Sequence, residues 1–223
     1  KQAIDRQDTC IIYDEKKEFT SLFYQPNTTI LIAAFDLRSA QWNFASDVRN
    51  LAQAKVIAAS MIEVNEKEPL WGQASRLIFI GAMMHCINTY GTQWGWKELA
   101  YFISLDEASM SEALQKSYPS ASKLVVEGSK TTQSLLINLT TSLSFLDDLA
   151  VAWPTAYKSH QSFSITTFLR QRSKKKVLII QNDPQFSALS DPIINVMITL
   201  LTNNLLAMKN SQKRKVWLFL DEL

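Results

Sequence analysis

The sequence predicts an α/β fold in which an all-α domain is inserted between two stretches of strand-forming chain. Short apolar runs rich in β-branched residues occur near both ends of the 223 residues. Between them, apolar residues recur three and four positions apart, and strand signals are missing. We therefore divide the chain into residues 1–45 and 154–223, which together form the α/β part, and residues 46–153, which form the helical insertion.

The first part is predicted to run strand, helix, strand. Residues 9–13 and 28–35 are apolar runs of the kind buried on both faces of a parallel sheet, and each is followed by an aspartate, Asp14 or Asp36. A short helix over residues 18–24 connects them and ends before a Pro-Asn pair.

The middle part contains helical periodicity throughout, with Ser46 as the expected N-cap of its first helix. The predicted helices cover residues 47–64, 70–90, 96–104, 106–117 and 129–152. Together they suffice for a small bundle. Trp71, Trp94 and Trp96 are interpreted as core or rim residues of this bundle; the alternative is a base-stacking platform, although only Lys97 is near enough to supply the interleaved basic residues.

Strand signals return in the last part. Residues 175–181 and 216–220 are predicted strands, and residues 192–209 form a long apolar helix between them. Basic runs at residues 174–176 and 213–215 precede the two strands. Each run is either a solvated strand entrance or a rim that faces DNA or a neighbouring subunit.

Composition narrows the classes of function. A net charge of +2 gives no support to a mode of nucleic-acid binding in which a large basic excess supplies the affinity. This small net charge does not exclude a local basic patch. Cys10 and Cys86 are far apart in apolar runs, which indicates buried free thiols. His85 and His160 have no cysteine or acidic neighbour at ligand spacing, so no zinc site is expected. No apolar run reaches the length of about 18 residues that a membrane span needs.

The strongest chemical signal is the strand at 216–220 followed by Asp221 and Glu222, which is the Walker B pattern. The alternative is that two acids follow an apolar strand here by chance. We expect the strand to be buried and its carboxyl end to open at the ligand crevice of the sheet. There Asp221 would hold Mg²⁺ through water, and Glu222 would activate the attacking water.

The matching phosphate loop, Gly-x-x-x-x-Gly-Lys-Ser/Thr or Walker A, is missing from a chain that has only 5 glycines. We therefore expect this sequence to be a piece of a longer protein whose Walker A loop lies just upstream of Lys1. On its own the piece is expected to bind ATP poorly or not at all and to be catalytically silent.

Several segments, taken in order, resemble the type IV secretion coupling proteins, and most closely the conjugative coupling ATPases of the TraD/TrwB kind. These segments are residues 11–19 (IIYDEKKEF), 23–24, 31–39 (LIAAFDLRS), 42–43, 69–71 with Arg76, 163–165, 168–169 and 214–223 (RKVWLFLDEL). The resemblance thus extends over nearly the whole chain.

The resemblance implies a RecA-like P-loop NTPase core, here partial because Walker A is absent, with an inserted all-α domain. It further implies a homohexameric ATPase that uses ATP and Mg²⁺ and is anchored in the bacterial inner membrane with its motor on the cytoplasmic face. Its implied partners are relaxase-bound DNA of the relaxosome or effector proteins, adaptor proteins and components of the secretion channel. An alternative is that the helical insertion is a substrate- or adaptor-binding module without catalytic activity.

Four further residues are candidates for structural roles in the motor core. Asp14 and Glu18 form either a solvated helix cap with a first-turn acid or part of the motor machinery. Asp36 and Arg38 are expected to form a local ion pair; the alternative is that Arg38 reaches the nucleotide of a neighbouring subunit.

Two departures from the family pattern indicate a divergent branch. Lys17 stands where the family usually has glycine, and Ala33-Ala34 stands where it usually has Asn-Pro. If the turn at Lys17 requires a positive φ, the loss of glycine removes the permissive backbone.

Overall fold

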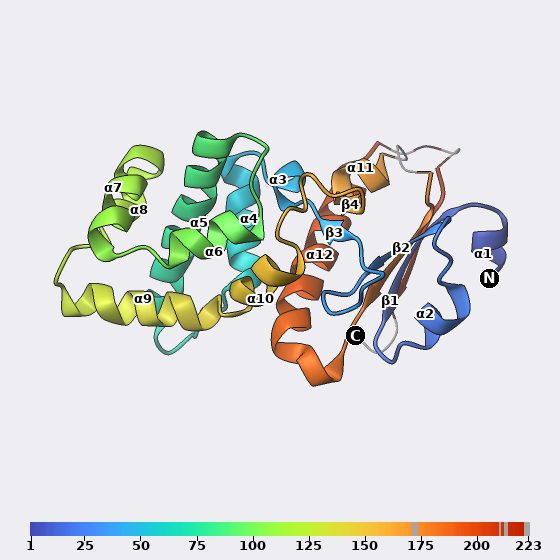
Figure 1. Ribbon diagram of the computed structural model, residues 1–223, viewed down its shortest axis with the longest axis horizontal. Helices are drawn as coiled ribbons and strands as arrows, with labels where there is room; N and C mark the ends of the chain where they lie inside the picture. The colour runs from blue at the N-terminus through green and yellow to red at the C-terminus, as the bar shows by residue number, and fades with distance from the viewer. Residues whose placement is uncertain (171–173, 210, 212–213, 221–223) are drawn as a thin grey trace. The chain divides into compact units, whose positions relative to one another are not determined.

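A computed structural model of the chain describes residues 1–170, 174–209, 211 and 214–220. The chain forms two compact units, an α/β unit from Lys1–Asn43 with Lys158–Leu223 and a helical unit from Phe44–Tyr157. Figure 1 shows the sheet strands in blue and orange, from the two ends of the chain, and the helical unit in cyan to yellow. The α/β fold with an inserted helical unit is therefore confirmed.

The α/β unit is built on a four-stranded parallel sheet in the order β2-β5-β1-β6. Its strands are β1 (Thr9–Asp14), β2 (Thr29–Ile32), β5 (Val177–Gln181) and β6 (Val216–Leu220). Every residue of β1, β2 and β5 is buried, which explains why these strands are continuous apolar runs rather than alternating ones.

Helices cover both faces of this sheet. In Figure 1, α1 (Gln2–Asp5) and α2 (Glu18–Phe23) lie on one side and α12 (Ser187–Ala207) lies on the other. The α1 and α2 side is closed by one apolar cluster, in which Phe19 and Phe23 pack against Cys10, Ile12 and Leu31 among others. The helix α11 (Ile165–Leu169) and the 3₁₀ helix η1 (Pro184–Phe186) complete the unit.

The expectation that the last strand is buried is wrong. The side chains of β6 from Trp217 to Leu220 are between 39% and 45% exposed. The reason is that β6 lies at the edge of the described sheet and pairs with β1 alone, whereas β1 and β5 each have neighbours on both sides.

A second, two-stranded parallel sheet stands where the chain leaves and re-enters the α/β unit. It pairs β3 (Gln41–Trp42) with β4 (Ser162–Phe163). The amide of Asn43 donates to the carbonyl of Phe163 at 2.7 Å, so the pairing reaches the last residue before the helical unit. Neither short strand was predicted, and the predicted strand over 28–35 is shorter, ending at Ile32.

The helical unit differs in detail from the predicted helices. Its elements are α3 (Phe44–Asp47), α4 (Leu51–Met61), α5 (Pro69–Tyr90), α6 (Trp96–Ile103), α7 (Glu107–Ser117), α8 (Pro119–Ser122), α9 (Lys130–Ser142) and α10 (Phe145–Ala152). Ser46 lies within α3, and the N-cap of α4 is Asn50, whose side chain accepts from the amide of Gln53. The single helix expected over 129–152 is interrupted at Leu143-Ser144.

Trp94, Trp96 and Trp153 belong to the core of this unit, whereas Trp71 is half-buried. Trp94 and Trp96 are fully buried, and the ring of Phe44 lies 4.5 Å from that of Trp96 and edge-on to that of Trp94 at 5.6 Å. Buried rings are not available to stack on nucleic-acid bases. The core interpretation of these two residues is therefore correct, and the base-stacking alternative is excluded for them.

Cys10 and Cys86 are buried free thiols, as predicted. Burial raises the pKa of both thiols above the ordinary cysteine value, which makes them poor nucleophiles.

Within residues 1–170, 174–209, 211 and 214–220, no single helix is both long enough and apolar enough to span a membrane. The pair α9 and α10 has the required length and apolar composition only when the two helices are taken together, and they are bent by 49° relative to each other.

The turn before α2 does require a positive φ, and a lysine occupies it. Lys17 is the N-cap of α2 with φ 63° and ψ 13°, the left-handed conformation that glycine adopts most easily. A side chain there costs about 1–2 kcal/mol. Lys17 in turn contributes an ion pair, because its Nζ lies 2.6 Å from Oδ2 of Asp183 after β5. An exposed pair of this kind offsets about 0–1 kcal/mol.

These opposing effects can be separated by two substitutions at Lys17. Lys17→Ala and Lys17→Gly both remove the ion pair, but only glycine relieves the left-handed strain. We expect the glycine variant to be about 0.5–1 kcal/mol more stable than the alanine variant, after allowing for the larger entropy of unfolded glycine. Urea unfolding followed by circular dichroism, with hydrogen exchange of α2 amides as a local probe, measures the difference. An alanine variant as stable as the glycine variant would show that the turn is unstrained.

Candidate functional site

Polar side chains lie at the edge of the sheet where the carboxyl ends of the parallel strands meet. Asp14 pairs with Gln181 in register, so the chain that follows β1 lies beside the chain that follows β5. Glu15 follows β1, and Asn182 and Asp183 follow β5. This edge is where open parallel sheets bind ligands.

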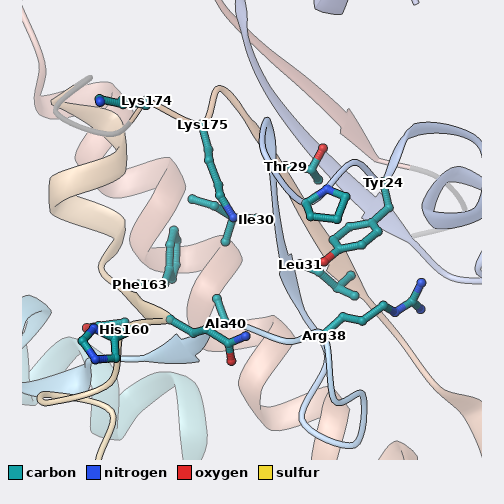
Figure 2. A pocket seen from close by; sticks show the side chains of 13 residues that line it. Tyr24, Thr29, Ile30, Leu31, Arg38, Ala40, His160, Phe163, Lys174 and Lys175 are labelled. Atoms are coloured by element: carbon teal, nitrogen blue, oxygen red, sulfur yellow. The ribbon is translucent and has the colours of Figure 1, made fainter.

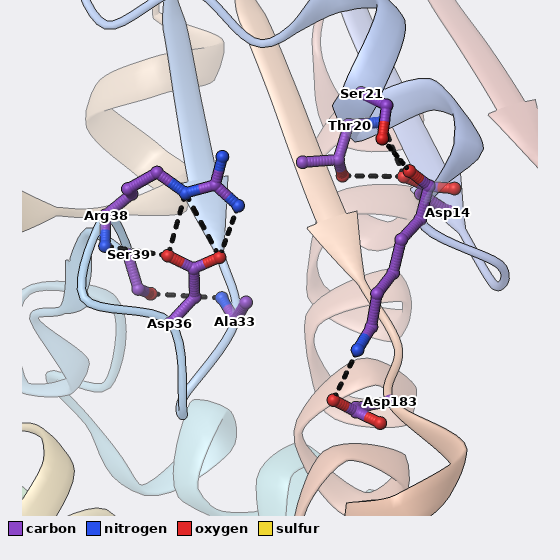
Figure 3. A network of polar contacts seen from close by, with 9 residues as sticks. Asp14, Thr20, Ser21, Ala33, Asp36, Arg38, Ser39 and Asp183 are labelled. Atoms are coloured by element: carbon purple, nitrogen blue, oxygen red, sulfur yellow. Dashed lines mark hydrogen bonds and ion pairs between the residues drawn. The ribbon is translucent and has the colours of Figure 1, made fainter.

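Asp14 anchors the start of α2. It is 1% exposed, and its carboxylate accepts from the backbone amides of Phe19 and Thr20, at 3.3 and 2.6 Å, and from the Thr20 hydroxyl at 2.6 Å. Figure 3 shows Thr20 and Asp14 facing each other. Asp14 therefore caps the helix, as one interpretation of the sequence proposed, but it is buried rather than solvated. Glu18 lies exposed in the first turn of α2, where a carboxylate interacts favourably with the helix dipole.

Asn182 connects β1, β5 and α12. Its side-chain amide donates to Oε2 of Glu15 at 2.9 Å and to the hydroxyl of Tyr13 at 3.4 Å. Its side-chain oxygen accepts from the Ser190 hydroxyl at 2.6 Å and from the Asp183 amide at 2.8 Å. Because Asn182 is only 6% exposed and uses both ends of its amide, it fixes the geometry of this edge.

Tyr13 and Glu15 share a hydrogen bond at the same edge, with the phenol as donor. Burial raises the pKa of Tyr13, and the hydrogen bond to the Glu15 carboxylate raises it further. The phenol therefore remains protonated over the physiological range and acts as a donor that orients Glu15.

An ion pair between Lys17 and Asp183 lies at this edge of the sheet, next to the start of α2. The ion pair between Lys17 and Asp183 lowers the pKa of Asp183, chiefly through the hydrogen bond from Lys17. Asp183 also accepts from the amide of Gln185 and so caps η1. The ion pair therefore joins the turns that follow β1 and β5.

Asp36 and Arg38 form a local pair after β2. The guanidinium contacts both carboxylate oxygens, with Nε 2.9 Å from Oδ1 and Nη2 2.5 Å from Oδ2, and the Arg38 amide donates to Oδ1 at 2.8 Å. The hydrogen bonds from Arg38 lower the pKa of Asp36. The Ser39 hydroxyl donates to the carbonyl of Ala40 and accepts from the amide of Ala33, which fixes the return of the chain from β2 (Figure 3).

Asp221 and Glu222, the expected metal and catalytic residues, lie outside the described residues. The strand that precedes them is described: β6 runs parallel to β1, and its last residue, Leu220, lies opposite Tyr13. In the sequence, Asp221 and Glu222 therefore follow β6 as Asp14 and Glu15 follow Tyr13 in β1.

The described part of the α/β unit does not supply a phosphate cradle of the glycine-rich kind. All 5 glycines of the chain, Gly72, Gly81, Gly91, Gly95 and Gly128, belong to the helical unit. Nor do the described residues contain a group of three or more His, Cys, Asp or Glu side chains placed to hold a metal ion.

Glu15, Asn182 and Asp183 also belong to this site, although they were not predicted from the sequence. One signal could have found them, because polar residues that directly follow a buried strand of a parallel sheet lie at its ligand edge. Gln181-Asn182-Asp183 follows its strand in the same manner as Asp14-Glu15. What the local sequence does not reveal is that these two strands are neighbours.

Comparison with known proteins agrees with this architecture. The chain is 25% identical over 228 residues to the coupling protein TraD of Escherichia coli (strain K12), which covers 99% of the chain and 30% of TraD. The unbound conjugative coupling protein TrwBΔN70 superposes with a TM-score of 0.77 at 21% identity, over 99% of this chain and 49% of that one.

Two further structures show the same fold. TrwB in complex with the non-hydrolysable ATP analogue ADPNP gives a TM-score of 0.77 at 20% identity, and TrwB in complex with ADP and Mg²⁺ gives 0.76 at 21% identity. The chain spans about half the length of these solved proteins, 51% of each. At this level of identity the likeness establishes the fold, a RecA-like core with a helical domain.

The sequence model of the family described as the type IV secretion-system coupling protein DNA-binding domain matches residues 1–223, the full length of the sequence. The chain thus belongs to the family of type IV secretion-system coupling proteins.

Proposed function

We propose that this chain is part of a coupling ATPase of a bacterial type IV secretion or conjugation system. The parent protein recruits relaxase-bound DNA or an effector protein and uses ATP hydrolysis to deliver it to the secretion channel. The observation that carries the proposal is the parallel pairing of β6 with β1, with Leu220 opposite Tyr13. The described part of β6 thus ends at the edge of the sheet that holds the Asp14 and Asn182 networks. In the sequence, Asp221 and Glu222 follow Leu220 directly.

The chemistry of the donors suits magnesium and a nucleotide. Mg²⁺ prefers carboxylate oxygens and keeps several waters, so one aspartate at a strand end, Asp221, is a fitting ligand through water. When bound, Mg²⁺ neutralises charge that develops on the phosphates. Glu222 would hold and deprotonate the attacking water. Residues 1–43 and 158–223 contain no glycine, and the chain spans about half the length of the solved relatives, so a glycine-rich phosphate loop would be supplied by another part of the parent protein.

The remaining features of the proposal concern assembly and partners. The parent protein would form a homohexamer, anchored in the inner membrane with its motor on the cytoplasmic face. It would engage the relaxosome, adaptor proteins, channel components and DNA. Support comes from the family membership and from the relatives, which are described as conjugative or plasmid coupling proteins.

Substitution of Glu222 tests the catalytic assignment in the full-length protein. Glu222→Gln retains the shape of the side chain and removes the base, so we expect ATP turnover to fall by about 10²-fold or more while ATP binding is kept. Glu66→Gln, in an exposed loop of the helical unit, is the matched control and should turn over like the parent. Turnover within twofold of the parent for Glu222→Gln would refute the role of Glu222.

A second candidate function is supported by the separate core of the helical unit. Residues 44–157 enclose their own aromatic cluster, in which Trp96 packs against Phe44 and lies 6.3 Å from Trp153. A unit with its own core can act as a binding module for a secretion substrate or an adaptor. This function is compatible with the motor, which needs a contact with its cargo.

Expression of residues 44–157 alone tests the module. We expect a helical circular dichroism spectrum and a cooperative unfolding transition, because the unit is compact and has its own cluster of buried aromatic side chains. The folded unit should then retain a relaxosome component, effector or adaptor of the cognate system in a pull-down, whereas the α/β unit loaded at the same concentration should not. A folded unit that retains none of them would count against the module.

A further inference from the structure

An open groove of about 660 Å³ lies on the helical unit beside α7. One wall is the exposed face of α7, and the other is the segment 122–127, at the end of α8 and in the turn before α9. Figure 1 shows α7 and α8 next to each other, with this segment leading from α8 to the start of α9. The groove is therefore formed within one unit, by elements that pack against each other.

The two walls of the groove run in opposite directions. At one end the Ser122 hydroxyl donates to Oε1 of Gln115 at 2.7 Å, and at the other end the Gly128 amide donates to Oε2 of Glu107 at 2.6 Å. Glu107 and Gln115 are eight positions apart in α7, which corresponds to about 12 Å at a rise of about 1.5 Å per residue. The groove is thus as long as about two turns of a helix.

Hydrogen bonds hold the wall opposite α7 in place before any ligand binds. The Val126 amide donates to the Thr132 hydroxyl at 3.0 Å, and that hydroxyl donates to the carbonyl of Leu124 at 3.3 Å. Thr132 belongs to α9 and is buried, so it ties the segment to a helix. A wall that is already fixed loses little conformational entropy when a partner docks on it.

Apolar surface lies between the two ends of the groove. Val125 is buried in its floor, whereas Val126 is 57% exposed and Ala108 of α7 is also exposed. Ala108 and Ser111 are small side chains, so they let a second helix approach α7 closely. The groove therefore offers an apolar contact to a partner of helical shape.

Two exposed charges of opposite sign lie at the opposite ends of the groove. Lys123 lies at the end marked by Gln115, and Glu127 lies at the other end. Across residues 1–170, 174–209, 211 and 214–220, neither side chain has a hydrogen bond or an ion pair. The other two charges of the lining neutralise each other, because Nζ of Lys116 lies 2.6 Å from Oε1 of Glu112.

These unpaired charges distinguish the groove from the cavity at the outer edge of β2, which Figure 2 shows. In that cavity Arg38 is engaged by Asp36, and Phe163 is buried. A ligand there would compete with contacts that the protein already makes. A ligand of the groove meets charges that have no other partner.

An elongated partner with opposite charges at its two ends complements the groove. Helices commonly carry acidic residues in their first turn and basic residues in their last turn, where these charges suit the helix dipole. An acidic first turn beside Lys123 and a basic last turn beside Glu127 make such a helix run antiparallel to α7. Its apolar stripe then lies on Val126, as in other helices that dock in grooves.

We propose that the groove lined by Ala108, Lys123, Val126 and Glu127 docks an amphipathic helix of another polypeptide, antiparallel to α7. The helix has an acidic residue and a basic residue about eight positions apart, at the two ends of an apolar stripe. The inference rests on the proposed role of the helical unit as a binding module, and adds to it the surface and the kind of segment that it binds.

Two helical peptides of the same composition test the groove, by fluorescence anisotropy with the full-length protein. Each has about 16 residues, blocked ends and the same leucine stripe. The first has glutamate in its first turn and lysine in its last turn, and the second has these residues exchanged. We expect the parent to bind the first peptide about fivefold more tightly, because its charges match those of the groove.

Exchange of the groove charges separates recognition from peptide helicity. The first peptide is the more helical one by itself, because its charges suit the helix dipole. In Lys123→Glu/Glu127→Lys we expect the ratio of the two affinities to fall by about tenfold or more, whereas a difference in helicity alone leaves this ratio unchanged. An unchanged ratio would overturn the proposed orientation.

Val126 tests the apolar contact. Val126→Asp places a carboxylate in this contact, so the affinity for both peptides should fall about tenfold. Val151→Asp is the matched control, at an exposed valine of α10 that does not line the groove, and should bind like the parent. Circular dichroism checks that each variant is folded. A folded Val126→Asp protein with parental affinity would place the helix elsewhere and overturn the site.

Sedimentation velocity distinguishes another polypeptide from a second copy of this chain. We expect the parent and Val126→Asp to sediment alike in the absence of peptide. An assembly of the parent that Val126→Asp weakens would assign the groove to self-association and overturn the proposed occupant.

The remaining outcomes separate this inference from the proposed function. A parent protein that binds neither peptide would refute the groove, while the pull-down with residues 44–157 would still decide whether the helical unit is a binding module. The Glu222→Gln measurement decides the ATPase independently of both.

Discussion

The parallel pairing of β1 with β5 is the interaction on which the rest of the α/β unit depends. In the sheet, β5 separates β1 from β2, yet the whole helical unit lies between β2 and β5 in the sequence. The strands β1 and β2 precede the helical unit in the sequence, and β5 follows it. The sheet is therefore complete only after β5 has inserted between β1 and β2. The ladder of β3 and β4 holds the outgoing and returning segments together. A contact of such long sequence separation costs loop-closure entropy, which the burial of every β1 and β5 side chain offsets.

The same pairing creates the polar edge of the sheet. With Asp14 opposite Gln181, the amide of Asn182 reaches the carbonyl of Asp14, and its side chain reaches Glu15 and Ser190. Lys17 participates through its side chain, although its backbone would suit glycine better. A lysine thus occupies a left-handed turn and adds an ion pair to the β5 side. Local strain is tolerated where surrounding contacts determine the conformation.

The two ends of the parallel strands differ in charge. Carboxylates and amides follow the carboxyl ends of β1 and β5, as Asp221 and Glu222 follow β6 in the sequence, while lysines precede the amino ends of β5 and β6. The proposed motor chemistry uses the first of these ends.

Sequence by itself determined the local structure. Continuous apolar runs marked β1, β2, β5 and β6, the spacing of apolar residues marked the helices of the middle part, and their apolar surroundings marked Cys10 and Cys86 as buried. Only the tertiary structure decided the strand order, the exposure of β6, the burial of Asp14 and the meeting of Asn182 with Glu15. The physical reason is that periodicity reports which faces of an element are apolar but not which neighbour covers them. A polar residue at a strand end therefore shows its importance only when the adjacent strand is known.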